Sequence, residues 1–134
     1  MPTPPQVITP LRVFLVEDRH DVQVALEELL RASGPFETIA TATTEAEAKL
    51  WLQEHPAQWE LAVVDLILEE GGGFGVVQRA RALHRRGRIA VMSGYLSDGL
   101  KRHCVSLGAD VVFEKGTPTE FQRWLGTWAT WSGG

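Results

Sequence analysis

The sequence predicts a doubly wound α/β domain built on a parallel sheet, and three observations carry this prediction. Short apolar runs alternate with amphipathic segments along the chain, and no internal repeat is evident. The run LAVVDLIL at 61–68 is almost continuously apolar, as expected for a strand buried on both faces. The 134 residues, of which 44% are hydrophobic and 22% charged, suit one globular domain. Such alternation favours strands joined by right-handed helical crossovers.

Five strands can be placed from these apolar runs. The clearest are LRVFLV, the LAVVDLIL run and RIAVM, whereas the second candidate is more polar. The strands are expected, in chain order, at residues 11–16, 36–41, 61–68, 88–92 and 110–113.

Five helices occupy the intervening segments. The segment 21–32 has apolar residues at helical spacing, and a Gly-Pro pair ends it. Thr43 or Thr44 can cap the next helix, which ends before Pro56. The other three helices are expected to follow the glycine-rich stretch 71–75 as far as residue 84, to span 96–107, and to run from a cap at Thr117 or Thr119 to about residue 130.

Composition excludes several classes of partner. The net charge of −4 argues against nucleic acid, which requires clustered cations.

The lone Cys104 rules out an internal disulfide and suits a reducing compartment. No apolar run approaches the length of a membrane span, and no signal peptide pattern is present, so a cytoplasmic protein is expected. The one basic cluster is interpreted as a solvated helix face: Arg79, Arg81, Arg85, Arg86 and Arg88.

The chemistry is concentrated where the predicted strands end. Glu17 and Asp18 follow the first strand, Asp65 lies in the third, and Ser93 and Lys115 follow the fourth and fifth. In open α/β sheets, ligands bind at the carboxyl ends of the strands. Taken alone, Asp65 could be a strand-terminal carboxylate that faces water. Buried and ionised without a partner, it would cost several kcal/mol.

Together these residue types indicate a phosphoryl-transfer site. Three carboxylates in one crevice repel one another, and a divalent cation resolves the repulsion. Oxygen ligands without clustered His or Cys favour Mg²⁺. Lys115 and Ser93 can meet phosphoryl oxygens, and a carboxylate nucleophile such as Asp65 gives an aspartyl phosphate.

Four motifs in order, FLVED, VVDLIL, VMSGY and GADVVFEK, resemble the receiver domain of two-component response regulators. The resemblance covers the chain from residue 11 to about residue 128. It implies the flavodoxin-like (βα)5 sandwich with strand order 2-1-3-4-5. Together with the length, it predicts a stand-alone receiver domain at 11–131 and a short tail at 132–134. The four prolines of residues 1–10 predict an extended tail there.

The resemblance implies a role for each acidic residue. Asp65 would accept the phosphoryl group. Asp18 would bind Mg²⁺ directly, and Glu17 would act through water. The backbone carbonyl of Ile67, two residues after the acceptor, would complete the protein's share of the metal ligands.

The resemblance also implies a switch. Ser93 and Lys115 would hold the phosphoryl oxygens, and Ser93 would move on phosphorylation. The family's switch aromatic usually lies three residues before the lysine, where this chain has Val112. Phe113 is adjacent but points to the other face of its strand. Tyr95 could serve as a substitute.

Two further departures concern the loops of the site. Glu69 stands four residues after the acceptor and Gly116 directly after the lysine, where the family often has proline. These departures motivate an alternative, a pseudo-receiver that binds partners independently of phosphorylation. A phosphate sink without its own output is a third possibility.

Other readings of the same segments are disfavoured. The glycine run 71–75 lacks the pattern of a nucleotide-binding loop. Ile67 stands where a dehalogenase-type phosphatase requires a second Asp. As a receiver, the chain would catalyse only its own phosphorylation and dephosphorylation.

The partners expected are a histidine kinase or histidine phosphotransfer protein as donor and a downstream protein that binds the 96–131 face. A homodimer is possible, and neither nucleic acid nor a membrane is expected. In the last helix, Phe121, Leu125 and Trp128 are predicted to pack in the core. Trp124 and Trp131 are candidates for an exposed aromatic patch.

Overall fold

Five parallel strands form one sheet in the order β2-β1-β3-β4-β5, which confirms the predicted fold class. The computed structural model describes residues 9–132, and their side chains as far as residue 128. The expected tails, 1–10 and 132–134, therefore lie almost entirely outside the described residues. The strands are β1 (Leu11–Val16), β2 (Phe36–Ala42), β3 (Leu61–Asp65), β4 (Arg88–Ser93) and β5 (Val111–Glu114).

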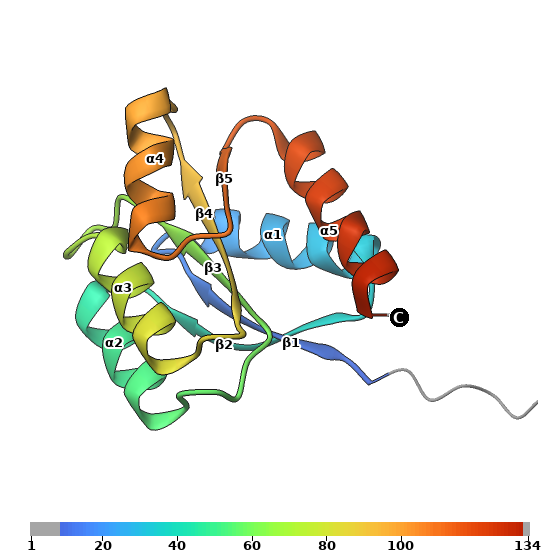
Figure 1. Ribbon diagram of the computed structural model, residues 1–134, viewed down its shortest axis with the longest axis horizontal. Coiled ribbons are helices and arrows are strands. Elements are labelled where there is room, and N and C mark those ends of the chain that lie inside the picture. The colour runs from blue at the N-terminus through green and yellow to red at the C-terminus, as the bar shows by residue number, and fades with distance from the viewer. Residues whose placement is uncertain (1–8, 133–134) are drawn as a thin grey trace, which may run out of the picture.

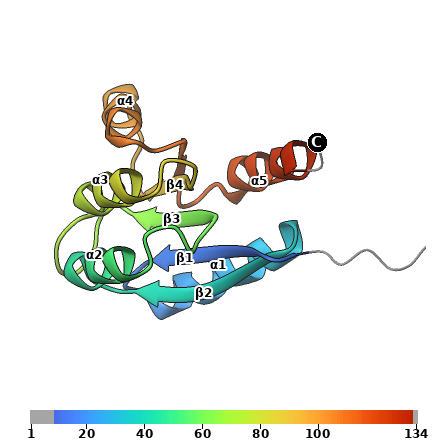
Figure 2. The same ribbon diagram turned by 60° about the horizontal axis from the view of Figure 1, so that its bottom comes forward.

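Five helices cover the two faces of this sheet. Figure 1 shows α2, α3 and α4 on one side and α1 and α5 on the other, and Figure 2 shows the same layers after rotation. Among the helices of the described part, none combines the length and apolar character needed to cross a bilayer. The helices are α1 (His20–Ser33), α2 (Glu45–Glu54), α3 (Gly73–Leu83), α4 (Asp98–Leu107) and α5 (Pro118–Ser132).

The core consists of two apolar clusters separated by the sheet. Every residue of β3 is buried, and alternate side chains enter opposite clusters: Val64 packs with α2, α3 and α4, and Val63 with α1 and α5. This two-sided burial is the reason the strand sequence is nearly all apolar. As predicted, the buried residues of the last helix include Phe121, Leu125 and Trp128.

The third strand is shorter than predicted. It ends at Asp65, because the chain turns there and Ile67 pairs only with Gly72 in an isolated antiparallel bridge. Leu66 and Leu68 are nevertheless 7% and 6% exposed, since the turn folds them back into the core. Burial without strand geometry explains why periodicity extended the strand to residue 68.

Side-chain caps set two helix starts. Thr44 accepts a hydrogen bond from the Glu47 N–H at 3.1 Å, so Thr44, and not Thr43, caps α2. Ser97 accepts from the Leu100 N–H in the same way, and α4 therefore begins at residue 98 and not at residue 96. Each cap satisfies a backbone donor that the first helical turn leaves unpaired.

The basic cluster is not simply a solvated face. Arg81 donates to the carbonyl oxygens of Gly108 at 2.8 Å and Gly87 at 2.7 Å, and it pairs with Asp110 at 2.8 Å. Its guanidinium thus joins the end of α3 to the turns before β4 and β5. Arg85 and Arg86 are exposed, as expected.

Candidate phosphoryl-transfer site

The acidic residues lie at the point where the strand order reverses. β1 lies between β2 and β3, and Val16 pairs with Val64 near the carboxyl ends of β1 and β3. Glu17 and Asp18 directly follow β1, and Asp65 is the last residue of β3. This is the edge where doubly wound sheets bind ligands.

The three carboxylates converge. One oxygen from each of Glu17, Asp18 and Asp65 lies within 4.8 Å of the other two. Glu17 is fully buried and Asp65 is 2% exposed. The convergence predicted from two separate strand ends is therefore present in the fold. Such a set of hard oxygen ligands suits a divalent cation.

Lys115 brings a positive charge to the same point. Its Nζ lies 2.7 Å from Oδ2 of Asp65 and 3.3 Å from Oε2 of Glu17. Its backbone N–H donates to the carbonyl of Ser93 at 2.9 Å, which fixes the loop after β5 beside β4. Burial alone lowers the pKa of Lys115, but Asp65 and Glu17 outweigh this effect and raise the pKa above its ordinary value.

Glu17 has the most perturbed environment of the cluster. Burial, followed by the neighbouring carboxyl group of Asp65, raises the pKa of Glu17 from 4.5 to about 7. Its Oε1 accepts the Arg19 N–H at 3.1 Å. Its buried Oε2 has no hydrogen-bond partner among the described residues, with only the ion pair to Lys115 nearby. An oxygen in this position fits a metal-bound water.

The side chain of Asp18 is joined to the backbone of the loop after β3 by a hydrogen bond. Oδ2 of Asp18 accepts the Glu69 N–H at 2.8 Å, and Oδ1 of Asp65 accepts the Ile67 N–H at 3.1 Å. A proline at position 69 has no N–H and could not make the first bond. The departure at Glu69 therefore adds an orienting contact to Asp18, which sequence reasoning did not foresee.

The candidate switch residues lie on both sides of the sheet. Oγ of Ser93 donates to the Tyr95 carbonyl at 2.6 Å and accepts the Tyr95 N–H at 3.2 Å, so it is engaged by the loop before α4. Val112 packs in the cluster beneath α4, whereas Phe113 stacks on Phe121 on the opposite face at 4.1 Å. The opposite directions of residues 112 and 113 agree with the sequence expectation.

Gly73 is required by the close approach of α3 to the acceptor strand. A Cβ at Gly73 would collide with the carbonyl oxygen of Asp65 and lie 2.9 Å from Cα of Leu66. Gly73→Ala is expected to destabilise the fold by about 1–3 kcal/mol, the usual cost of forcing extra volume into a packed site. Urea unfolding would measure this loss. The control is Gly99→Ala on α4, where the nearest atom to a Cβ would be Nη2 of Arg102 at 4.0 Å, and equal stability of both variants would contradict the argument.

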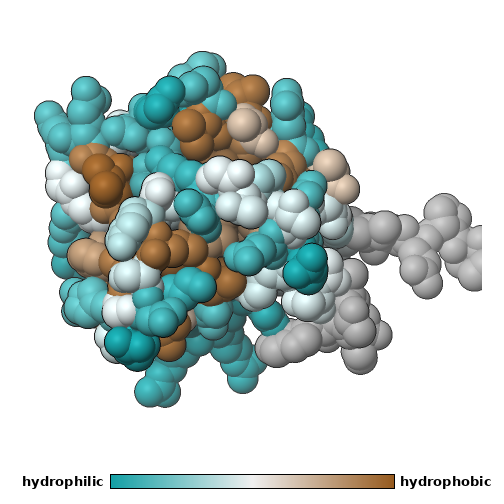
Figure 3. Space-filling view, turned by 90° about the horizontal axis from the view of Figure 1, so that it is seen from above, coloured by the Kyte–Doolittle hydropathy of each residue, from teal (hydrophilic) through white to brown (hydrophobic). Residues whose placement is uncertain are grey.

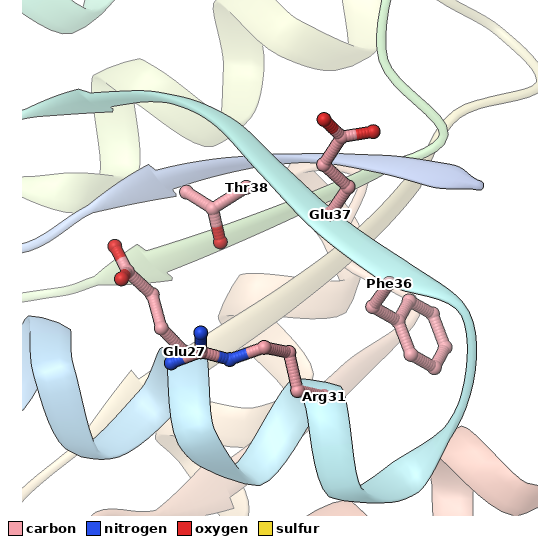
Figure 4. A pocket seen from close by; sticks show the side chains of 5 residues that line it. All are labelled: Glu27, Arg31, Phe36, Glu37 and Thr38. Carbon is pink, nitrogen blue, oxygen red and sulfur yellow. The ribbon is translucent and has the colours of Figure 1, made fainter.

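A pocket at the amino end of the sheet lies away from the carboxylate–lysine site. It has a volume of about 220 Å³ and lies between α1 and the start of β2. Figure 4 shows the side chains of Glu27 and Arg31 on α1 beside β2, and the ring of Phe36 at the start of β2. The first residues of β2 lie at the amino end of the parallel sheet, away from the strand ends where ligands bind in this fold.

Fold and site together define a doubly wound α/β domain with a carboxylate–lysine centre at the carboxyl edge of its sheet. A model of the response regulator receiver domain family matches residues 13–122. The chain therefore belongs to the response regulator receiver domain family.

Solved structures share the fold at low sequence identity. The signal receiver domain of a DNA-binding response regulator from Colwellia psychrerythraea 34H is 21% identical, with a TM-score of 0.77, covering 90% of this chain and 98% of that chain. CheY in the CheX–CheY complex with BeF3 and Mg²⁺ from Borrelia burgdorferi is 19% identical, with a TM-score of 0.72 and coverage of 89% and 90%.

A third structure was determined with a phosphorylated aspartate and a calcium ion. This response regulator from Burkholderia pseudomallei is 23% identical, with a TM-score of 0.66. The match covers 78% of this chain and 59% of that chain.

Proposed function

We propose that Asp65 accepts a phosphoryl group from a phosphohistidine donor with the help of Mg²⁺, and that this event switches a protein-binding surface. The single observation that carries the proposal is the convergence of three carboxylate oxygens within 4.8 Å, with the Lys115 ammonium 2.7 Å from Asp65. Receiver structures that hold BeF3 with Mg²⁺, or a phosphorylated aspartate with calcium, support it.

The residues present fit a magnesium ion. Asp18 and Asp65 supply carboxylate oxygens, the carbonyl of Ile67 lies on the adjoining loop, and Oε2 of Glu17 is a buried acceptor available to a bound water. Mg²⁺ prefers a few carboxylates together with retained waters. When bound, it would neutralise charge on the phosphoryl oxygens.

The chemistry of transfer then follows from the side chains. A carboxylate oxygen of Asp65 attacks phosphorus, the bond from phosphorus to the donor's imidazole nitrogen breaks, and its electron pair leaves with that nitrogen. The ammonium of Lys115 forms an ion pair with Asp65 and can stabilise the negative charge on the phosphoryl oxygens after transfer. The protein mainly positions groups and stabilises charge.

A protein donor agrees with the surface around the site. Ile67 is 76% exposed and Tyr95 is 75% exposed, and they belong to the loops that follow β3 and β4. Exposed side chains of this size beside a reacting group are suited to burial under a partner. A histidine kinase or a histidine phosphotransfer protein supplies both the phosphohistidine and such a covering surface.

The switch would begin at Ser93. Its hydroxyl now bonds the backbone of Tyr95, and a phosphoryl group on Asp65 would offer it stronger, charged acceptors. Exchange of that bond would draw the loop before α4 toward Asp65. The phosphoryl group thus favours one of two loop arrangements, in proportion to its differential contacts with them.

A downstream protein would recognise the 96–131 face, and this face can also support a homodimer. Val105 on α4 is 56% exposed, and Trp124 is half-buried against Phe121 and Trp128. The side chain of Trp131 lies outside the described residues. Figure 3, which views the molecule from above, shows separate apolar patches among polar groups. Such a surface suits a reversible partner.

The proposal is tested with the wild-type chain, Mg²⁺ and acetyl phosphate. Intact-mass measurement is expected to show one added phosphoryl group, and beryllofluoride is expected to shift the amide signals of the Ser93–Tyr95 loop. A pseudo-receiver would give neither result. A phosphate sink would give the adduct, with rapid loss and no partner selective for the phosphorylated form.

A further inference from the structure

The glycine-rich loop that precedes α3 is held in place by a residue from another element. Ile67, whose carbonyl is the proposed metal ligand, pairs with Gly72 in an antiparallel bridge. The N–H of Gly73 donates to the carbonyl of Leu66 at 3.0 Å and closes the loop at its base. The position of Gly72 therefore determines the position of the Ile67 backbone.

Glu45, the first residue of α2, contacts this loop at two points. Its Oε1 accepts the Gly72 N–H at 2.8 Å, and its own backbone N–H donates to the Glu70 carbonyl at 3.1 Å. Its Oε2 pairs with Lys49, one helical turn later, at 2.6 Å. One side chain thus joins the start of α2 to the backbone opposite Ile67.

The glycines fit closely around this carboxylate. A Cβ at Gly71, which has a φ of 85°, would lie 2.5 Å from Cβ of Glu45. A Cβ at Gly75 would lie 2.6 Å from its Oε2. Consecutive glycines also leave the loop with much conformational freedom to lose on folding. The loop is therefore shaped to receive Glu45 and depends on an external contact for its order.

The Glu45–Gly72 hydrogen bond also compensates for the absence of a proline in the loop. Position 69 carries Glu and not proline, so φ is not fixed by a ring within the loop. In place of this restraint, three hydrogen bonds hold the loop: Asp18 accepts the Glu69 N–H, the Glu45 N–H donates to the Glu70 carbonyl, and the Glu45 side chain accepts the Gly72 N–H. The first bond involves a proposed metal ligand, whereas the two bonds made by Glu45 involve none of the three clustered carboxylates.

We propose that Glu45 is a positioning residue for the metal site: by holding Gly72 it fixes the Ile67 carbonyl in place, and so it sets the affinity for Mg²⁺. This inference rests on the proposed function, because it takes the Ile67 carbonyl to be a metal ligand. Preorganised ligand backbone raises affinity because less ordering remains to be done on binding.

The test compares Mg²⁺ affinity in three variants with that of the wild type, by titration followed through the amide signals of residues 66–69. Glu45→Ala is expected to weaken binding about three- to tenfold, the effect of losing one hydrogen bond. Glu45→Gln keeps an oxygen for the Gly72 N–H and is expected to stay within about twofold of wild type. The matched control is Glu47→Ala, which removes an exposed acid of the same helical turn.

An unchanged affinity in Glu45→Ala overturns the proposal, as does an equal loss in Glu47→Ala or no recovery in Glu45→Gln. A second measurement needs no variant. Coupling is reciprocal, so Mg²⁺ must strengthen the Glu45–Gly72 bond and slow hydrogen exchange at the Gly72 amide of the wild-type chain. Unchanged exchange under saturating Mg²⁺ also overturns the proposal. If the wild type binds no Mg²⁺ at all, the proposed function fails, and this inference fails with it.

Discussion

Asp65→Asn is expected to carry no phosphoryl adduct after incubation with Mg²⁺ and acetyl phosphate, whereas the wild-type chain carries one. The amide of Asn is not a nucleophile of comparable strength, and no other carboxylate in the cluster combines the Lys115 contact at 2.7 Å with a place at the end of β3. The loss should be complete by intact mass. Mg²⁺ affinity should also fall at least about tenfold, because a charged ligand becomes neutral.

The same variant should remain folded. Asp65 is 2% exposed and lies beside a second buried carboxylate, Glu17, so neutralising it relieves repulsion. The variant loses the ion pair of Asp65 with Lys115, but Lys115 keeps Glu17 at 3.3 Å, and the new amide oxygen can still accept the Ile67 N–H. Thermal unfolding without Mg²⁺ is expected at or above the wild-type temperature. Asp98→Asn, an exposed acid in the first turn of α4, is the matched control and should keep the adduct. An adduct on Asp65→Asn would move the acceptor to another residue.

The stability of the metal-free protein is expected to fall as pH rises through about 7, and Glu17 is the cause. Its pKa in the folded protein is raised to about 7 from 4.5, first by burial and then by Asp65. The folded state therefore holds this proton more tightly than the unfolded chain does. The stabilisation is fully present below pH 4.5 and is lost as pH rises through the folded-state pKa.

Glu17→Gln isolates this contribution, because the amide cannot ionise. The free energy of unfolding of Glu17→Gln minus that of wild type should increase between pH 5.5 and pH 8, on the order of 1–2 kcal/mol. Saturating Mg²⁺ should remove most of the wild-type fall, since the cation favours the ionised carboxylate. Urea unfolding at several pH values provides the measurement. A difference that stays constant with pH would show that Glu17 does not titrate in this range.

The candidate site was predictable because of where its residues lie in the chain. Glu17, Asp18 and Asp65 each follow or end an apolar run, and parallel strands bring their carboxyl ends to one edge. The position of Glu45 in the chain gave no indication of a role at the site. It stands in the first turn of an ordinary amphipathic helix, where an acidic residue is expected for the helix dipole alone.

The predicted end of the third strand was wrong because buried residues there do not have strand geometry. Residues 66–68 are apolar because Leu66 and Leu68 reach the core from a turn, and a pattern of apolar residues does not distinguish this from a strand. The sequence predicts a solvated Arg81 because the basic cluster around it lacks interleaved aromatic residues. Its partners, Gly108 and Asp110, come from a turn distant in the chain.

By itself, the sequence determined the order of the elements, the two-sided burial of the sheet and the presence of the acidic and basic groups at strand ends. These depend on local periodicity and on a topology that parallel strands make nearly obligatory. Only the tertiary structure decided which oxygen of each carboxylate faces Lys115, that the Glu69 N–H orients Asp18, and that Glu45 holds Gly72. Those contacts join residues far apart in the chain, and packing of loops against the sheet edge sets their distances.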